Sequence, residues 1–380
     1  MRQPVTRRLR QHHWEVVPDG ESGISASVIW ASPAGLAFII LGAENCRPEC
    51  SGPDLSLHPG RKTPRKGHRD IMLTIAVSAR ALFHMEDGHR IFETEGPDAY
   101  DRYMRETEHK PLRPGAAFPL VRKLLKLNEV DSTGRPIAAT QKVCVVLLSR
   151  NSPSAGLRVM NSTRHYNLAI ERALFCKGAD RFRYARALGA DLFLSLHGSD
   201  VSKALENGIP AATLQPKEQE ESDDTEIRIA FDGDSVLFSP EADLVYLNGG
   251  LQAFTQHEMD KAKLPLGAGP FKTVLEKLHS LQQTYPPGQS PIKLSLVTNR
   301  GMPAHERPIQ TLRAWGIELD EVVFGAGAPK GPILKALKAD IFFDDSAKNI
   351  SSAADAEVVG GHVPFGHGAI ESTEPLKLAA

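Results

Sequence analysis

Short apolar runs alternate with longer amphipathic stretches along most of the chain, from Leu73 onward. Amphipathic stretches with helical periodicity predict helices over Phe118–Leu127, Pro270–Leu281 and Pro332–Lys338. The apolar runs are typical of buried strands, and they cover residues 73–78, 143–148, 191–196, 227–231, 292–297, 321–324 and 340–343. Such alternation predicts an α/β fold, with Rossmann-like parallel sheets flanked by helices.

The first part of the chain, residues 1–70, has a different texture, with scattered proline, glycine, arginine and histidine. Its one apolar run, Ser27–Ala43, is 17 residues long and contains Pro33 and Gly35. A membrane helix needs roughly 20 apolar residues. We therefore expect a poorly ordered leader over 1–70, rather than a secretory signal, a membrane anchor or a metal site at Cys46 and Cys50.

An acidic segment without apolar residues, 216–226, divides the rest of the chain and is predicted to be a linker. It separates a first half, 71–215, from a second half, 227–370, which a short tail over 371–380 follows. The two halves align with each other. Both Pro111 and Pro265 open a Pro-Leu-x-x-Gly stretch, at an offset of 154 (265 − 111) that also relates Ser78 to Asp232.

Further matches follow in the same order over both halves. They include Leu148-Ser-Arg-Asn151 with Val297-Thr-Asn-Arg300, Lys177-Gly178 with Lys330-Gly331, and Ala190-Asp-Leu-Phe-Leu-Ser195 with Ala339-Asp-Ile-Phe-Phe-Asp344. Two unrelated amphipathic segments share apolar positions, but not such proline and glycine landmarks. The order of the matches therefore predicts an internal duplication.

Composition changes this picture little. With 380 residues and 41% hydrophobic content, the chain is long enough for two cores. A formal net charge of -1 favours neither nucleic acid nor an anionic membrane as a partner. Four cysteines are too few for a disulfide framework, and Cys144 lies in an apolar run where a reduced core thiol is expected. These features favour a cytoplasmic protein.

Polar residues at the predicted strand ends of the second half indicate a site. Each lies where a strand of a parallel sheet ends or a helix begins, so we expect their side chains to converge at one edge. The residues are Asp232, Asp234, Thr298, Lys330, Asp344 and Asp345.

These residue types suit phosphoryl transfer through an aspartyl-phosphate. One carboxylate can attack phosphorus, and another two positions later can protonate the leaving oxygen and then deprotonate water. Several acids at one edge need a cation, and oxygen ligands favour Mg²⁺. A hydroxyl and an ammonium, here Thr298 and Lys330, can stabilise charge on the transferred group.

The motifs resemble those of the haloacid-dehalogenase-like (HAD-like) superfamily and, within it, the type I cytosolic 5'-nucleotidases. The resemblance covers residues from about Leu73 to Gly366. It rests on Phe231-Asp-Gly-Asp-Ser-Val-Leu-Phe-Ser239, Gly327-Ala-Pro-Lys-Gly-Pro332, Ile341-Phe-Phe-Asp-Asp345, Ala76-Val-Ser-Ala-Arg-Ala-Leu-Phe83 and His362-Val-Pro-Phe-Gly366. It implies two tandem HAD-like halves and Mg²⁺-dependent hydrolysis of nucleoside 5'-monophosphates to nucleoside and phosphate.

The resemblance also implies roles for single residues. Asp232 becomes the nucleophile, Asp234 the general acid and base, Thr298 a phosphoryl ligand, and Lys330 the group that balances charge. Asp232, Asp234 through its main-chain carbonyl, Asp344 and Asp345 would hold Mg²⁺. Gly233, Asn299 and Arg300 are candidate substrate contacts, although an exposed turn explains the last two equally well. Val236 departs from the threonine that many members of the superfamily have in this region.

The first half lacks these acids. Ser78 aligns with Asp232, Arg80 with Asp234, and Ser195-Leu196 with Asp344-Asp345, so this half is predicted to be catalytically degenerate. It can serve as a scaffold and lid. Alternatively, its cleft binds a nucleotide effector or contacts the substrate through Ser78, Arg80, Ser149 and Lys177.

Other functions stay open at this level. A HAD-type phosphatase of another small phosphomonoester, or a nucleotide-binding sensor without turnover, would use the same residues. His362 and His367 follow the last predicted strand and are candidates for the edge of the site, although an exposed role suits them as well. An oligomer is compatible with the sequence.

Overall fold

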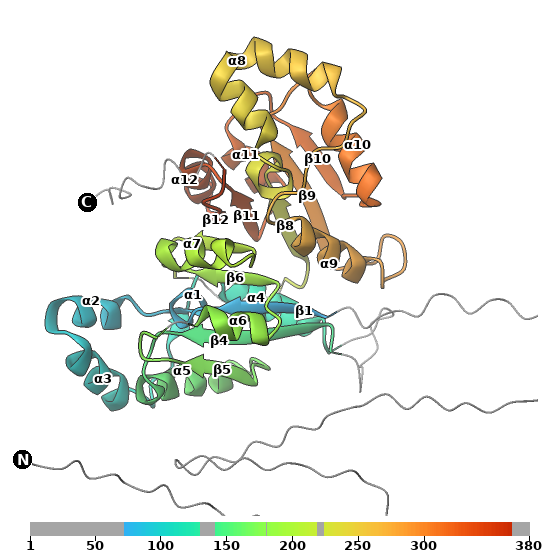
Figure 1. The fold of residues 1–380 in the computed structure, drawn as a ribbon. Coiled ribbons are helices and arrows are strands. Elements are labelled where there is room, and N and C mark those ends of the chain that lie inside the picture. Colours follow the sequence, from blue (N-terminus) through green and yellow to red (C-terminus); the bar gives the residue numbers. More distant parts are fainter. Residues whose placement is uncertain (1–71, 130–140, 180, 219–223, 367–380) are drawn as a thin grey trace, which may run out of the picture. The chain divides into compact units, whose positions relative to one another are not determined.

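The computed structural model describes residues 72–129, 141–179, 181–218 and 224–366, which belong to one compact unit of the chain. The predicted leader, the tail, His367 and residues 219–223 of the central linker lie outside the described residues. Figure 1 shows strands flanked by helices, as the hydrophobic pattern predicts.

Ten strands form one sheet in the order β10-β9-β8-β11-β12-β7-β6-β1-β4-β5, and every pairing in it is parallel except that of β7 with β12. The first half supplies β1 (Leu73–Val77), β4 (Val143–Ser149), β5 (Arg172–Phe175), β6 (Leu192–Ser195) and β7 (Ala211–Leu214). The second half supplies β8 (Ile227–Phe231), β9 (Ile292–Thr298), β10 (Glu321–Phe324), β11 (Ile341–Asp344) and β12 (Val359–His362). A separate two-stranded ribbon pairs β2 (Phe83–His84) with β3 (Arg113–Pro114).

Helices connect the strands in both halves. The first half has α1 (Ala79–Leu82), α2 (Glu86–Glu95), α3 (Pro97–Glu106), α4 (Phe118–Lys126), α5 (Pro153–His165), α6 (Phe182–Ala187) and α7 (Gly198–Glu206). The second half has the π-helical turn η1 (Gly233–Leu237), then α8 (Glu241–Asp260), α9 (Lys272–Gln282), α10 (Glu306–Trp315), α11 (Lys330–Ala336) and α12 (Ala347–Asp355).

Side chains alternate along each strand between two faces of the sheet, and each face has its own core. On β1, Ile75 and Val77 join a large cluster that includes buried residues of α4 and α9, so one core runs through both halves. Ala76, between them, joins a smaller cluster with residues of α6 and α7. Phe342 on β11 belongs to a third cluster, with residues of α11 and α12. The helices thus bury both faces, as a parallel sheet requires.

The two halves share their strand order and several hydrogen bonds. From β7 to β5 and from β12 to β10 the order is the same, with β1 in the place of β8 and β4 in that of β9. The Asp191 carboxylate accepts a bond from the Thr74 amide at 2.8 Å, and Asp340 accepts one from the Arg228 amide at 2.8 Å. These matches support the predicted duplication.

The Pro-Leu-x-x-Gly landmarks have a steric reason. A Cβ on Gly115 would lie 2.8 Å from the carbonyl carbon of Phe83, and one on Gly269 would lie 2.4 Å from the Val236 oxygen. Both glycines let one loop pass directly against the backbone that follows the first strand of its half. A substitution at either position would displace that backbone.

Two lysines join the halves by reciprocal contacts. Lys123 of α4 lies 2.7 Å from Asp340 of the second half, and Lys277 of α9 lies 2.7 Å from Asp191 of the first half. Lys123 is buried and also contacts Asp224, whereas the Lys277 side chain is 39% exposed. Lys277 is the equivalent of Lys123, and Asp191 is the equivalent of Asp340. The two contacts are therefore related as in a two-fold symmetric interface.

The structure corrects one pairing from the sequence alignment. Lys177 was matched with Lys330, but Lys177 has φ 46° and Gly178 has φ 82°, the same turn as Ala326 (φ 48°) and Gly327 (φ 84°). Counting forward without a gap from the ends of β5 and β10 then places Arg181, just before α6, opposite Lys330. The alignment was wrong there because the Lys-Gly pair of the first turn is identical to Lys330-Gly331, whereas its structural equivalent is the Gly-x-Gly turn just before that pair.

All seven predicted strands and all three predicted helices are present, with ends that differ by at most two residues. The sequence did not predict β5, β7 and β12, which are four residues each. Cys144 is a buried free thiol on β4, as expected, and burial raises its pKa. Among the described residues, we find no helix with the length and apolar character that crossing a bilayer demands.

Candidate active site

The turn that follows β8 positions the first predicted acid. The Asp232 amide donates to the Phe343 carbonyl of β11 at 2.8 Å, so the residue is fixed between two parallel strands at their carboxyl ends. The chain then enters η1, where Ser235 has φ 61° and its hydroxyl donates to Asp243 at 2.7 Å. A Cβ on Gly233 would lie 3.3 Å from the Phe238 ring. The turn aims Asp232 at the sheet edge.

Asp234, the second predicted acid, forms a two-point ion pair with Arg300. Both distances, Nε to Oδ2 and Nη2 to Oδ1, are 2.7 Å. Arg300 also contacts the carboxylate of Glu258, which in turn binds Arg307 at 2.8 Å. Fork-to-fork contacts of this kind fix geometry as well as charge. Asp234 is therefore oriented from α8 and from the loop after β9.

Lys330 joins two further acids. Its ammonium lies 2.8 Å from Asp232 Oδ1 and 2.6 Å from Asp344 Oδ2. The other groups on Asp344 are the Ser346 amide at 2.8 Å and the Asn349 amide nitrogen at 3.1 Å. Lys330 is 1% exposed, so the three charges share a site from which water is largely excluded. The pKa of Lys330 is raised, because the two carboxylates outweigh the opposing effect of burial.

The acids at this edge fit a hard divalent cation. Oxygens of Asp232, Asp344 and Asp345 all lie within 4.8 Å of one another. Burial, together with the neighbouring charges of Asp232 and Asp344, raises the pKa of Asp345 to about 9. Burial likewise raises the pKa of Asp232, against the attraction of Lys330. One ammonium leaves negative charge in excess, which a cation bound by carboxylates would offset.

The remaining predicted residues lie around this cluster. Thr298 is the last residue of β9, is buried, and accepts a bond from the Arg300 amide at 3.2 Å. Asn299 follows it and is exposed. His362, paired in register with Asp344, bonds through Nε2 to the Asp345 carbonyl at 2.9 Å. Of the predicted substrate contacts, Arg300 already forms ion pairs with two acids. Its contact with substrate stays a prediction.

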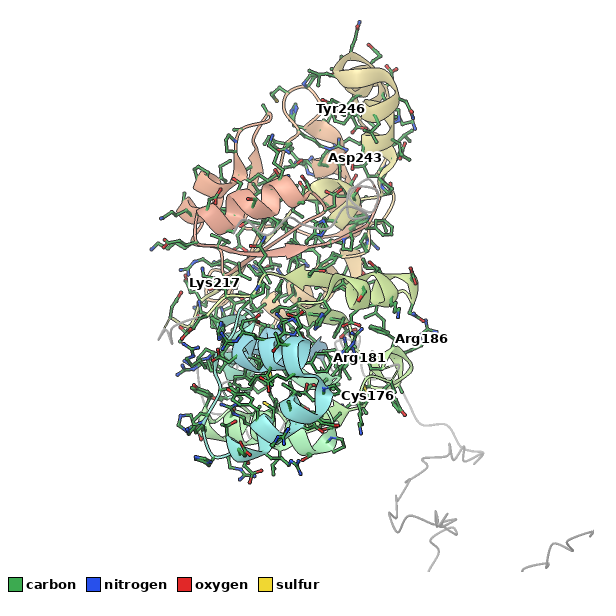
Figure 2. All side chains as sticks on the ribbon, turned by 90° about the vertical axis from the view of Figure 1, so that its left-hand side faces the viewer. Cys176, Arg181, Arg186, Lys217, Asp243 and Tyr246 are labelled. Atoms are coloured by element: carbon green, nitrogen blue, oxygen red, sulfur yellow. The ribbon has the colours of Figure 1, made fainter. Side chains whose placement is uncertain are left out.

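Helix α8 follows η1 and carries exposed apolar side chains. It bends at Gly250, which has φ 70° and ψ −170°. Tyr246 and Asp243 lie on its first segment (Figure 2). Leu244, Tyr246 and Leu251 are at least 50% exposed. In the first half a similar bend at Gly96, with φ 88°, separates α2 from α3. Each half therefore has a bent helical segment after its first strand.

Two partners in the site were not predicted. Glu258 is completely buried beneath Arg300 and Arg307, and Asn349 binds both oxygens of Asp344. Glu258 lies near the end of α8, and an acid on a helix is normally a solvated surface residue. Asn349 follows the acid pair by four residues, and in the sequence it looks like an ordinary residue at the start of a helix. Neither position carries a sequence signal, because its importance comes from long-range packing.

In the first half, the four residues singled out from the sequence all line one cavity. Ser78 caps α1 by accepting the Ala81 amide, and Arg80 binds Glu86 through two bonds. Ser149 accepts the Asn151 amide, and Lys177 lies in the turn after β5. The cavity has a volume of about 580 Å³. The equivalent edge of this half therefore has hydroxyls and cations where the second half has acids.

Comparison with known proteins places the chain in a family. A family model described as 5'-nucleotidase matches residues 66–369. A curated relative, human (Homo sapiens) cytosolic 5'-nucleotidase 1B, is 37% identical over 289 residues, which cover 74% of this chain and 47% of the relative. Among solved structures, histidinol dehydrogenase from Elizabethkingia anophelis aligns at 8% identity over 79% of this chain and 85% of that one. Its TM-score is 0.18, which supports no inference.

The fold and the acidic edge thus define an α/β protein with three carboxylates and a buried lysine at the carboxyl edge of its sheet. The chain belongs to the 5'-nucleotidase family, as the sequence motifs indicate. It spans about half the length of the curated relative that it matches.

Proposed function

We propose that this protein is a cytoplasmic, Mg²⁺-dependent 5'-nucleotidase that hydrolyses nucleoside 5'-monophosphates in its second half, residues 227–370. The observation that carries the proposal is the convergence of Asp232, Asp344 and Asp345 around Lys330 at the carboxyl edge of the sheet. Family membership supports the substrate class. Mg²⁺ held by Asp232, the Asp234 carbonyl, Asp344 and Asp345 would neutralise charge on the phosphoryl group.

The first step uses Asp232. Its carboxylate attacks phosphorus, the bond from phosphorus to the nucleoside 5' oxygen breaks, and an aspartyl-phosphate forms. The leaving oxygen takes a proton from Asp234. Lys330 holds the Asp232 carboxylate at 2.8 Å and orients it for the attack. Thr298, buried at the end of the neighbouring strand β9, donates its hydroxyl to a phosphoryl oxygen.

The second step reverses the proton transfer. Asp234, now ionised, takes a proton from water, which attacks phosphorus and releases phosphate and free Asp232. Arg300 occupies both oxygens of Asp234, so one of these bonds must open when Asp234 carries the proton. Arg300 and Glu258 are therefore positioning residues, which connect the acid to α8.

Phosphate release from a panel of substrates tests this function. The panel holds nucleoside 5'-monophosphates, sugar phosphates and a 5'-phosphorylated DNA oligonucleotide, each with Mg²⁺ and with a chelator. We expect release from nucleotides, and loss of release in the chelator. A HAD-type phosphatase of another class would instead prefer a sugar phosphate or the DNA end, and a nucleotide sensor would bind nucleotides but release nothing.

The Asp232→Asn variant removes the nucleophile with little change in shape. We expect its turnover to fall by a factor of at least about 10³, which is typical of losing a covalent nucleophile. Asp355→Asn, an exposed substitution on α12, is the matched control and should keep full turnover. Full activity in Asp232→Asn would reject the mechanism.

A further inference from the structure

The first half contains a cavity at the edge of the sheet that corresponds to the catalytic edge of the second half. Its volume is about 580 Å³, within the range of pockets that hold small organic ligands. It is lined by the ends of β1 and β4, by the turn after β5, and by α2 and α3. No catalytic acid of the second half lines it.

Cations outnumber acids on the sheet side of this cavity. Arg80, Arg150, Lys177 and Arg181 line it, and two carboxylates bind three of these side chains. Glu86 binds Arg80, and Asp200 binds both Arg150 and Arg181. Among the described residues, no salt bridge forms at Lys177. The wall formed by the strand ends therefore has net positive charge, in contrast to the acidic edge of the second half.

Two nitrogen donors of lining residues have no hydrogen-bond partner. Arg181 is 2% exposed, and its guanidinium reaches Asp200 through one terminal nitrogen while Nε is unpartnered. Figure 2 shows Arg181 close to Cys176, in the first half. Asn151 accepts a bond from Tyr100 at 3.2 Å, and its amide nitrogen is unpartnered. A buried donor without an acceptor is unfavourable by roughly 1–3 kcal/mol, and an oxyanion would satisfy such donors.

A second wall of the cavity, formed by α2 and α3, is aromatic and acidic. Phe92 and Tyr100 lie edge to face at 6.0 Å, and Phe92 is 48% exposed. Asp98 and Asp101 of α3 line the same wall. An aromatic face stacks on a planar ring, and carboxylates accept bonds from hydroxyl or amino groups. The cavity thus offers cations at the strand ends, and on α2 and α3 a surface that can bind a planar ring and hydroxyl groups.

The arrangement is a charge-reversed copy of the catalytic edge. Arg181 is in the place of Lys330, and Asp200, five residues after Ser195, corresponds to Asn349, which is five residues after Asp344. The acid of this half, Asp200, lies on a helix, whereas a bound cation would need an acid at the strand end. The hydroxyls and cations at the strand ends can bind an anion directly.

We propose that this cavity is a second ligand site, which binds the phosphate of a nucleotide at Arg150, Asn151, Lys177 and Arg181 and its base at Phe92. The site is without a nucleophile or a metal ligand set, so the bound nucleotide is not hydrolysed there. The inference rests on first-half residues and is independent of turnover in the second half.

Isothermal titration of the full chain with a non-hydrolysable probe tests the site. The probe is a nucleoside 5'-phosphonate in which a methylene group replaces the bridging oxygen, and inorganic phosphate is titrated separately. With Mg²⁺ present, wild type is expected to bind two probe molecules per chain. The double variant Asn151→Asp, Lys177→Gln should bind one of the two at least tenfold more weakly, because it adds a charge that repels phosphate and removes one that attracts it.

Three matched variants make the result specific. Lys203→Gln, an exposed change on α7 outside the cavity, should leave both sites intact. Phe92→Ala should weaken the probe at the second site by about tenfold and leave inorganic phosphate unaffected, since stacking on an aromatic ring contributes about 1–3 kcal/mol. Asp232→Asn should retain the second site, so failure of catalysis and failure of this site are separable.

One probe molecule per wild-type chain, with no change in the double variant, would overturn the proposal. Equal affinity for inorganic phosphate and the probe at the second site would overturn its nucleotide specificity. Thermal unfolding of each variant confirms that it is folded before the titration is interpreted.

Discussion

The two edges of this sheet have the same backbone layout and opposite charge. In the second half Asp232, Asp344 and Asp345 surround a single ammonium, Lys330. In the first half the equivalent strand ends carry Ser78 and Ser195, while arginines line the cavity. An acidic edge suits a cation and chemistry through it, and a basic edge suits an anion alone. A few substitutions at strand ends separate the proposed catalytic site from the proposed binding site on one scaffold.

The comparison also shows what both halves keep. Arg158 donates to the Lys110 carbonyl at 3.0 Å, and Arg307 donates to the Leu264 carbonyl at 2.9 Å. Beneath Arg307 lies the carboxylate of Glu258, whereas the sulfur of Met104 lies beneath Arg158. The arginine fixes the same loop in each half, and the acid beneath it occurs only in the half with the proposed active site.

The largest expected effect comes from breaking the charge cluster of the second half. Lys330→Met leaves Asp232 and Asp344 close together without their ammonium, and should lower kcat by about 10²–10³ through lost orientation and charge stabilisation. Steady-state phosphate release measures it. Lys335→Met, an exposed change on the same helix, is the control. Equal turnover in the two variants would remove Lys330 from the mechanism.

The reciprocal lysines between the halves should differ in their contribution to stability. Lys123→Met removes a buried cation from Asp340 and should lower the free energy of unfolding by about 3 kcal/mol. Lys277→Met removes a partly exposed one from Asp191 and should cost less than about 1 kcal/mol. Urea unfolding of both variants gives the difference. Similar values would mean that burial does not distinguish the two contacts.

The buried acid of the second half offers a narrower test. Glu258→Gln keeps the shape but weakens the contacts to Arg300 and Arg307, and should destabilise the fold by about 2 kcal/mol. Met104→Leu, the equivalent position of the first half, should cost less than about 1.5 kcal/mol. Because Arg300 orients Asp234, we also expect a shifted pH–rate profile in Glu258→Gln and not in Met104→Leu. Coinciding profiles would mean that Glu258 has a structural role only.

A smaller effect should appear as pH dependence of the first half. Burial lowers the pKa of His197 to about 4, opposed by Asp200 and reinforced by Arg80, Arg150 and Arg181. The unfolded state, with a pKa near 6.5, then binds more protons between about pH 4 and 6.5, so stability falls as pH falls through this window. Lowering the pH from 7 to 5 should therefore lose about 1–2 kcal/mol more in wild type than in His197→Gln.

Much of the fold and the site was accessible from sequence. The apolar runs ending in Asp232, Thr298 and Asp344 fixed both the strands and the edge where their polar ends meet, because parallel strands share a carboxyl edge. Strand β5 escaped prediction since its sequence, Arg-Ala-Leu-Phe, has little alternation. Arg181 was missed because a Lys-Gly pair nearby gave a better local match than the gap-free alignment.

Other parts depend on contacts that no local pattern carries. Glu258 and Arg300 are 42 residues apart, and their contact depends on how α8 packs over the loop after β9. The cavity of the first half likewise combines Arg150 from the loop after β4 with Lys177 and Arg181 from the loop between β5 and α6. Periodicity predicts elements, whereas charge balance at a site appears only after those elements are assembled.

The most direct test of the central claim, that chemistry belongs to the second edge alone, is phosphate release by Asp232→Asn with saturating nucleoside 5'-monophosphate and Mg²⁺. We expect a fall of at least about 10³-fold, with no residual activity from the first half, because Ser78 and Arg80 supply neither nucleophile nor acid. Turnover within about tenfold of wild type would contradict it, and would place the reaction somewhere other than the acidic edge.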